Sequence, residues 1–403
     1  MGELPLELRR KQLMANYWAG LQGHNNSHPT KAVLQESWEN GKNLKDNFGR
    51  IGNVVAKELE VFHLRISSTV VYPEIAPWKL FWPEVDWFVL EEKRKAKEDI
   101  NLERVFKNWV LEKYNEYIKI YTDGAKNPET EVTGLGVVLP DRGIGVNRRT
   151  SDKLGVYTVE MLAMLIALRW VEKTGQDKVL ICSDSASALA SLRSFYSKSR
   201  QDILFEVLQS VTRIVNQGRQ VKFIWVPGHV GIKGNEMADK LAKRALTKGK
   251  IEMQVSVSKA EVKSVIWERI NQKWQERWDG EGKGRHLYQI QREVKHKIVD
   301  SGNRREEIVL TRLRLGHCLL NKTLKLIGRH DTGLCEGCQE EESVEHVVLR
   351  CNGFGAQREV MRNELREIGV QDITLKGLLS TEHRAQTRIL INFLRVTGVF
   401  YRI

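Results

Sequence analysis

The chain has 403 residues, of which 41% are hydrophobic and 29% charged, as in globular proteins with room for two or three domains. No apolar run approaches the ~20 residues that cross a bilayer, and the N-terminus lacks the apolar core of a secretory signal. The sequence therefore argues against membrane and secreted proteins and predicts an intracellular protein, nuclear or cytoplasmic. The five cysteines are few and odd in number, which argues against a disulfide framework.

The net charge of +13 comes from an excess of Lys and Arg in the middle of the chain. Residues 121–249 carry +6 and residues 250–330 carry +8, whereas residues 1–120 carry +1 and residues 331–403 carry −2. A basic excess favours a polyanionic partner, of which nucleic acid is the first candidate. On charge alone, a basic protein without such a partner is the alternative.

Residues 1–116 are predicted to be helical with one extended segment. Helical apolar spacing runs through Arg9–Leu21 and about residues 29–40, and a charged helical pattern returns over 91–117. Residues 65–90 contain three prolines, which exclude a long helix. This part of the chain shows no catalytic pattern.

From residue 118 the hydrophobic pattern changes from helical to alternating. Three strands come first, and helices then alternate with two further strands. This order predicts an α/β domain over residues 117–248, with a mixed five-stranded sheet and flanking helices. The expected strands are residues 118–122, 134–139, 143–147, 179–182 and 221–226, and the expected helices are 158–173, 185–192, 205–216 and 235–245.

The remaining chain is expected to be mostly helical and to form two further segments. Residues 249–330 are a basic helical region with a helix over 262–278. Residues 331–403 hold a cysteine cluster and end in a helix at about 385–396.

Four acidic residues of the predicted α/β domain occupy strand ends or helices. Asp123 and Asp184 follow or end strands, Glu160 lies in the first turn of a helix, and Asp239 lies inside the last helix. Sites commonly form at this edge of an α/β sheet. Carboxylates gathered there repel one another unless Mg²⁺ neutralises them, and a pair of such ions can catalyse an in-line phosphoryl displacement. Each acid alone has an ordinary alternative role, as a helix cap or a partner of the helix dipole.

The four acids resemble the ribonuclease H type 1 family in order, spacing and local sequence. The matching motifs are Tyr121–Gly124, Val159–Met161, Ser183–Ser185 and Gly234–Asp239, and Trp225–Gly231 resembles the family's mobile histidine loop. The resemblance implies that Asp123, Glu160, Asp184 and Asp239 bind two Mg²⁺ ions, for which Mn²⁺ can substitute. It also implies that His229 assists proton transfer or product release. The implied activity is an endoribonuclease that hydrolyses the RNA strand of RNA–DNA hybrids.

Two departures from the family concern the binding of substrate. Free-standing members carry a basic helical handle, where this chain has only Ser194–Ile203. They also place polar residues ahead of the helix glutamate, where this chain has Gly155-Val156-Tyr157. The basic residues 250–330 are the candidate replacement, because phosphate contacts dominate affinity for nucleic acid.

The flanking regions resemble the C-terminal part of non-LTR (LINE-type) retrotransposon polyproteins, in which ribonuclease H follows a reverse transcriptase. The opening Gly2–Lys11 and the chain after residue 257 carry this resemblance, and no Tyr-x-Asp-Asp polymerase motif occurs. It implies that residues 1–116 resemble the connection after a reverse transcriptase. It also implies a reverse transcriptase encoded upstream as a partner.

The cysteine cluster has the pattern Cys335-x2-Cys338-x7-His346-x4-Cys351. Three thiolates and an imidazole form a closed tetrahedral set for structural Zn²⁺. Glutamates between these ligands would repel phosphate, which favours a structural site over one that grips RNA. Three ordinary buried thiols and a surface histidine are the alternative.

Two other function classes compete with the nuclease. One is a domesticated or inactive nucleic-acid-binding protein derived from a retrotransposon, and the other is an integrase-like DNA strand transferase. The intact acids and His229 argue against the first. The Gly-Asn-Glu sequence ahead of Asp239 and the histidine loop argue against the second.

Overall fold

The computed structural model describes residues 3–33, 48–96, 100–294, 303–371, 373–379 and 384–403. Residues 34–40 of the helix expected at 29–40 lie outside the described residues. The chain forms two compact units, residues 11–267 and residues 268–403 together with 1–10. These units join segments that are separate in the sequence-based division at residues 116, 248 and 330.

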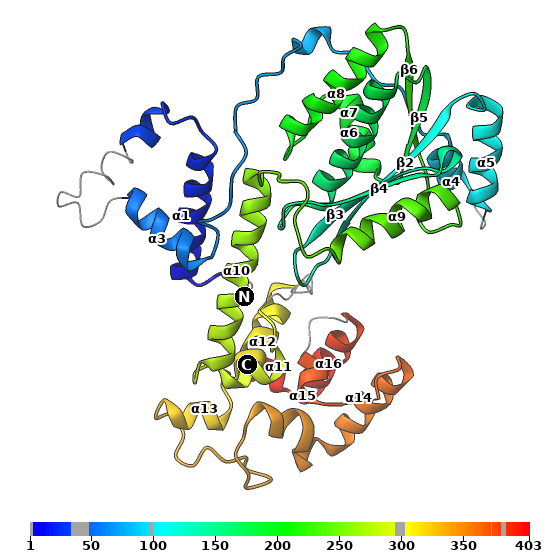
Figure 1. Cartoon of the computed structure of the whole chain (residues 1–403). Helices are drawn as coiled ribbons and strands as arrows, with labels where there is room; N and C mark the ends of the chain where they lie inside the picture. The colour runs from blue at the N-terminus through cyan, green and yellow to red at the C-terminus, as the bar shows by residue number, and fades with distance from the viewer. Residues whose placement is uncertain (1–2, 34–47, 97–99, 295–302, 372, 380–383) are drawn as a thin grey trace. The chain divides into compact units, whose positions relative to one another are not determined.

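A mixed sheet of six strands, in the order β1-β6-β5-β2-β3-β4, lies at the centre of the first unit (Figure 1). Strands β2, β3 and β4 form an antiparallel meander, and β5, β6 and β1 continue the sheet parallel to β2. The strands are β1 (Val85–Asp86), β2 (Ile118–Lys126), β3 (Thr133–Leu139), β4 (Ile144–Arg149), β5 (Lys178–Ser183) and β6 (Gln220–Trp225).

The α/β prediction for this region is confirmed, but the expected number of strands is wrong. Five strands agree with the expected ones, and the sixth is β1, which pairs in parallel with β6 through Val85 and Phe223. β1 has only two residues, which is too short for the alternation that identifies a strand.

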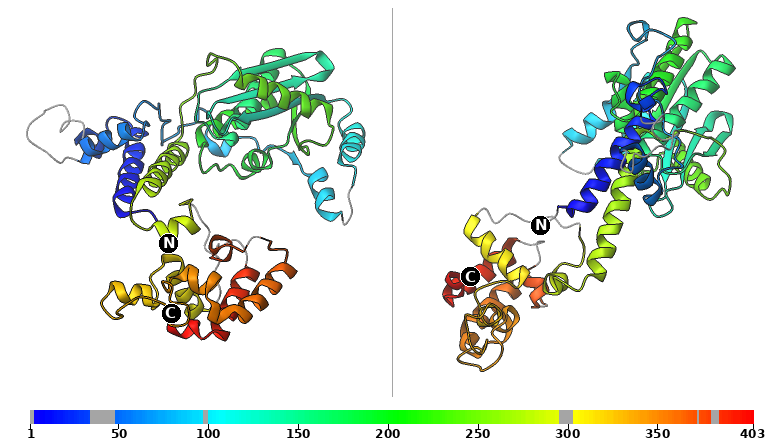
Figure 2. Two further views of the ribbon diagram at one scale, coloured as in Figure 1. Left: turned by 90° about the horizontal axis from the view of Figure 1, so that it is seen from below. Right: turned by 90° about the vertical axis from the view of Figure 1, so that its left-hand side faces the viewer.

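Helices cover both faces of the sheet (Figure 1 and Figure 2). Asp123 pairs with Gly136 and Gly124 with Leu135, and paired residues point to the same face. A Cβ on Gly124 would come within 2.7 Å of the α6 backbone, and one on Gly136 within 2.2 Å of the α9 backbone. The two helices therefore lie on opposite faces, and glycine lets both approach closely. The helices are α6 (Val156–Thr174), α7 (Ala186–Ser194), α8 (Gln201–Asn216) and α9 (Lys233–Leu246).

The residues before β2 combine helices with an extended segment, as the prolines predict. The extended segment is tied to α8, because the Ile75 amide donates to Gln209 (2.9 Å) and the Phe81 amide to Thr212 (2.9 Å). The elements here are α1 (Leu6–Gln22), α3 (Phe48–Glu58), the 3₁₀ turn η1 (Pro77–Lys79), α4 (Phe88–Lys95) and α5 (Leu102–Lys113).

The second unit is helical and contains a hydrophobic core. That core contains Leu313 and Cys318 as well as Val348 and Leu394, so residues on both sides of position 330 share it. The helix expected over 262–278 lies within α10. The helix expected at about 385–396 is α16, and the short helix α17 follows it. The elements are α10 (Lys259–Gly280, which begins in the first unit), α11 (Arg285–Ile290), α12 (Arg304–Leu315), α13 (Asn321–Leu326), η3 (His346–Arg350, a π-helical turn), η4 (Asn352–Phe354), α14 (Gly355–Glu367), α15 (Leu375–Leu379), α16 (Arg384–Val396) and α17 (Val399–Arg402). Within the described part of the chain, no helix has the length and apolar character needed to cross a membrane.

Candidate active site

Three of the predicted acids meet where β2 runs beside the carboxyl end of β5. Asp123 lies in β2, Glu160 in α6, and Asp184 directly after β5. One carboxylate oxygen from each lies within 4.8 Å of the other two. Asp123 and Glu160 are buried, with exposed fractions of 7% and 4%, and Asp184 is partly exposed. Solvent therefore reaches the group mainly through Asp184.

The electrostatics of this group favour a cation. Burial and, after it, the nearby carboxylates of Asp184 and Asp239 raise the pKa of Asp123 to about 7. Burial also raises the pKa of Glu160 well above its ordinary value, with Asp123 and Asp184 adding to the rise. Among the described residues, Glu160 Oε2 has no hydrogen-bond partner although it is buried. A hard divalent cation would satisfy this oxygen and offset the repulsion between the carboxylates.

Asp184 is held from two sides by groups that the sequence did not single out. Asn235 Nδ2 donates to Asp184 Oδ2 (3.1 Å), and Trp225 Nε1 donates to the Asp184 carbonyl (3.0 Å). Both residues lie within the motifs that resemble the ribonuclease H family. That position in the sequence is the signal that could have identified them.

Asp239 lies outside the group of three, on α9. Its carboxylate accepts a hydrogen bond from Lys243 (2.8 Å), one helical turn away. It is nevertheless near enough to raise the pKa of Asp123. The structure thus places Asp239 at the border of the site, paired with a lysine.

His229 lies on an exposed loop beside the carboxylates. Its φ of 59° is in the left-handed region, which is uncommon for residues other than glycine. The preceding Gly228 lies against the site, because a Cβ there would come within 2.9 Å of Asp184 Oδ2. The loop is therefore anchored next to Asp184 while the His229 side chain faces solvent.

A comparison with known families agrees with this geometry. The family model described as RNase H matches residues 115–247. Residues 115–247 form an RNase H domain. The match differs from the predicted boundaries, 117 and 248, by two residues and one. It covers the sheet strands from β2 onward and all four acids, and it supports a nuclease acting on nucleic acid.

An aromatic contact lies in the short connection Ser194–Ile203, where free-standing members of the family carry a basic helical handle. Phe195, at the end of α7, has a φ of 55°. Its ring packs against Trp82 of the extended segment in a tilted arrangement, with ring centroids 4.1 Å apart. Residues before the matched region thus pack against the short connection between α7 and α8.

The second predicted metal site lies in the other unit. The ligand atoms of Cys335, Cys338, His346 and Cys351 all lie within 4.8 Å of one another. Cys351 Sγ is 3.9 Å from Cys335 Sγ and 3.7 Å from Cys338 Sγ. His346 is 1% exposed, and its Nδ1 lies 3.1 Å from Glu340 Oε2.

The remaining histidine nitrogen supports a metal at this position. In the described structure, His346 Nε2 is buried and has no hydrogen-bond partner. A carboxylate beside the other ring nitrogen is the usual arrangement for a histidine that binds a metal. The pattern of three thiols and one imidazole fits Zn²⁺. Cys318, another thiol of this unit, is buried in the hydrophobic core and lies outside this group.

Proposed function

We propose that this protein is an endoribonuclease that hydrolyses the RNA strand of RNA–DNA hybrids. The observation that carries the proposal is the convergence of Asp123, Glu160 and Asp184 within an RNase H domain. A structural ion pair would place a cationic side chain among them, but here the largest influence on Asp123 and Glu160 is burial beside other acids. Such perturbed groups are characteristic of functional sites.

The three carboxylates fit Mg²⁺, and Asp239 is proposed to join them in holding two ions. The orphaned Glu160 Oε2 and the raised pKa of Asp123 are the observations that support the fit. When bound, the ions would supply positive charge for the attack of water on a phosphodiester and for the departure of the leaving oxygen. Mn²⁺ offers the same preference for oxygen ligands and is expected to substitute.

Other groups of the chain would position the carboxylates and assist the reaction. Asn235 fixes Asp184 through one oxygen. The Gly124 backbone favours the charged forms of Asp123 and Glu160 and so lowers their pKa values against the effect of burial. His229, exposed on its loop, is proposed to carry a proton or to aid release of the product. Its exposure allows contact with substrate without burying the ring.

We also propose that Cys335, Cys338, His346 and Cys351 bind a structural Zn²⁺. The closed set of four ligands leaves no position for a substrate, which distinguishes a structural from a catalytic zinc site. Its expected effect is to hold residues 331–360 in the helical unit.

The flanking regions support a proposal about origin. Their resemblance to non-LTR retrotransposon polyproteins favours a chain that derives from such an element, acts on hybrids made by a reverse transcriptase, and works in the nucleus or cytoplasm. Mixing the purified chain with a reverse transcriptase of this class, followed by size-exclusion chromatography, would test the partnership. Separate elution at micromolar concentration would contradict it.

The proposed activity is tested by offering the full chain three labelled duplexes in Mg²⁺: RNA–DNA hybrid, RNA duplex and DNA duplex. The hybrid alone should be cut, in its RNA strand, because RNase H enzymes read 2′-hydroxyl groups. Asp184→Asn, which keeps the side-chain shape, should abolish cleavage. Failure of the wild type to cut the hybrid would favour the binding protein, and cleavage of the DNA duplex would favour the strand transferase.

A further inference from the structure

Helix α6, which carries Glu160, begins without a cap of its own. Its N-cap residue is Gly155, which has no side chain to accept a hydrogen bond from the first turn. The first amides of a helix have no partner within the helix and need an acceptor from elsewhere. Because Glu160 follows five positions after Gly155, the order of this first turn bears directly on the carboxylate site.

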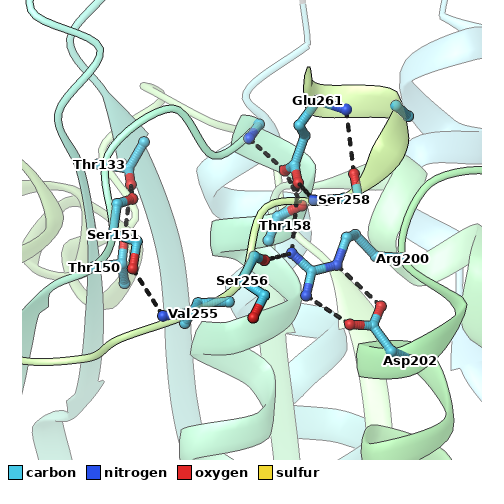
Figure 3. A network of polar contacts seen from close by, with 12 residues as sticks. Thr133, Thr150, Ser151, Thr158, Arg200, Asp202, Val255, Ser256, Ser258 and Glu261 are labelled. Carbon is cyan, nitrogen blue, oxygen red and sulfur yellow. Dashed lines mark hydrogen bonds and ion pairs between the residues drawn. The ribbon is translucent and has the colours of Figure 1, made fainter. Parts of the chain in front are cut away.

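Glu261, at the start of α10, supplies the missing acceptor (Figure 3). Its Oε1 accepts from the Gly155 amide (2.6 Å) and from the Thr158 hydroxyl (2.5 Å). The residue is 8% exposed. A carboxylate is the favoured group at a helix N-terminus, because the exposed amides there carry partial positive charge.

The second oxygen of the same carboxylate caps α10 itself. Glu261 Oε2 accepts from the Ser258 amide (2.7 Å), while the Glu261 amide donates to the Ser258 hydroxyl (3.2 Å). This reciprocal pair is a capping box. One side chain therefore caps two helices that are about a hundred residues apart in the sequence.

The buried guanidinium of Arg200 balances this carboxylate. Arg200 is 2% exposed, and its Nη1 lies 3.5 Å from Glu261 Oε2 and donates to the Ser256 carbonyl (3.0 Å). The other side of the guanidinium binds Asp202 through two bonds, of 3.0 and 2.7 Å. Figure 3 shows these groups converging. Buried charges are tolerated when they are paired and hydrogen-bonded in this way.

The segment that leads to Glu261 is itself fastened to the end of the sheet. Met253 forms a β-bridge with Thr150, just after β4, and the Val255 amide donates to the Ser151 hydroxyl (2.8 Å). Val257 forms a parallel bridge with Ile66 of the N-terminal region. These contacts hold the segment that precedes α10. The backbone of that segment therefore helps to place Glu261.

From this arrangement we infer that Glu261 is a positioning residue for the active site: it orders the first turn of α6 and thereby places Glu160. The inference rests on the proposed function for its catalytic consequence. Residue 261 lies beyond position 247, where the RNase H match ends. The working RNase H unit of this chain accordingly extends at least to the first turn of α10.

The test compares Glu261→Ala and Glu261→Gln with Glu268→Gln in the full chain. Glu268 is an exposed glutamate on the same helix and serves as the matched control. Hydrogen exchange of the α6 amides, measured by mass spectrometry, reports the cap without any assay of activity. Loss of a cap typically changes local stability enough to speed exchange about five-fold. We expect this acceleration in α6 for Glu261→Ala, a smaller one for Glu261→Gln, and none for Glu268→Gln.

The second readout is the Mg²⁺ dependence of hybrid cleavage. If Glu261 positions Glu160, the Mg²⁺ concentration for half-maximal cleavage should rise about three- to ten-fold in Glu261→Ala, while the rate at saturating Mg²⁺ stays within about two-fold. A general loss of folded protein would lower the rate without moving this midpoint. An unchanged midpoint together with unchanged exchange in α6 would overturn the inference.

Thr158→Ala keeps the inference testable if Glu261→Ala does not fold. This variant removes one donor to Glu261 and leaves the buried charges paired, so it should show the same shifts at smaller size. If the wild type fails to cut hybrid, the proposed function fails, whereas exchange in α6 still decides whether Glu261 caps the helix.

Discussion

The two candidate metal sites of this chain differ in almost every physical respect. The carboxylate site combines like charges, burial and an unpaired oxygen, and burial raises the pKa of two of its members. The cysteine site combines thiols with an imidazole whose Nδ1 lies beside a carboxylate. The first arrangement costs free energy when no cation is present. The second brings four ligands together, and the histidine among them keeps one ring nitrogen available for a metal.

This difference suggests how each site relates to stability. Mg²⁺ keeps waters and binds a few carboxylates weakly, so it can exchange and admit substrate phosphates. A structural zinc site binds with an apparent ~10–16 kcal/mol at neutral pH and contributes this free energy to folding. We therefore expect the carboxylate site to lower the stability of the metal-free fold while it supports catalysis. We expect the cysteine site to stabilise the fold without taking part in catalysis.

The largest expected effect is on zinc. Protein purified without added metal should hold about one zinc per chain, and Cys338→Ser should lose it because three ligands leave an incomplete shell. Residues 331–360 should then become sensitive to protease, while hybrid cleavage changes less than about two-fold. Atomic emission, limited proteolysis and the hybrid assay measure the three quantities.

Cys318→Ala is the matched control, since Cys318 is a buried thiol outside the group. It should retain zinc. Absence of zinc from the wild type would show that the cysteines of the cluster are ordinary thiols. Loss of cleavage together with zinc would show that the two sites are coupled.

The next effect concerns Asp123. Asp123→Asn should lower hybrid cleavage about a thousand-fold or more, because an amide is a poorer ligand for a hard cation. The same substitution should stabilise the metal-free protein, because it removes one of the buried like charges. Linkage from a pKa of about 7 in the folded protein, against 3.8 as the ordinary value, gives about 4 kcal/mol at pH 8.

The sign of the pH dependence follows from the raised pKa of Asp123. Between about pH 4 and 7 the folded protein keeps a proton that the unfolded chain releases, so metal-free protein should lose stability as the pH rises through this window. Urea unfolding in EDTA at several pH values measures the slope. Asp123→Asn should flatten it, and Asp141→Asn, at an exposed acid of the same domain, should not. A wild-type slope of the opposite sign would contradict the assigned electrostatics.

The smallest expected effect is that of His229. His229→Ala should slow hybrid cleavage about ten- to a hundred-fold yet leave it measurable, because the proposed charge stabilisation does not come from this exposed ring. Single-turnover and steady-state rates measured together would separate proton transfer from product release. A variant as inactive as Asp184→Asn would show that His229 has a larger role than proposed.

The sequence predicted the parts of the fold that depend on local pattern. The five longer strands and the helices that carry Glu160 and Asp239 were readable, because each extends over enough residues to show its period. The motifs also indicated which acids to consider. They did not show that Asp239 pairs with Lys243, because a lysine one turn away on a helix is common and carries no signal of its own.

Long-range contacts account for most of what the sequence did not predict. β1 has two residues and is identified only by its pairing with β6. The capping box at Ser258 and Glu261 follows the readable pattern Ser-x-x-Glu, but its second role on Gly155 depends on how the chain returns across the sheet. Contacts of that kind leave no period in the sequence.

The short strand β1 also bears on how this domain behaves when it is cut out of the chain. β6 lies inside the sheet only because β1 covers its outer side, through the pairs Val85 with Phe223 and Asp86 with Ile224. A fragment that begins at residue 115 would leave the amides and carbonyls of β6 as a free edge, which is a template for pairing with a second copy. Such a fragment should self-associate in proportion to its concentration, whereas one that keeps residues 73–114 should stay monomeric in sedimentation.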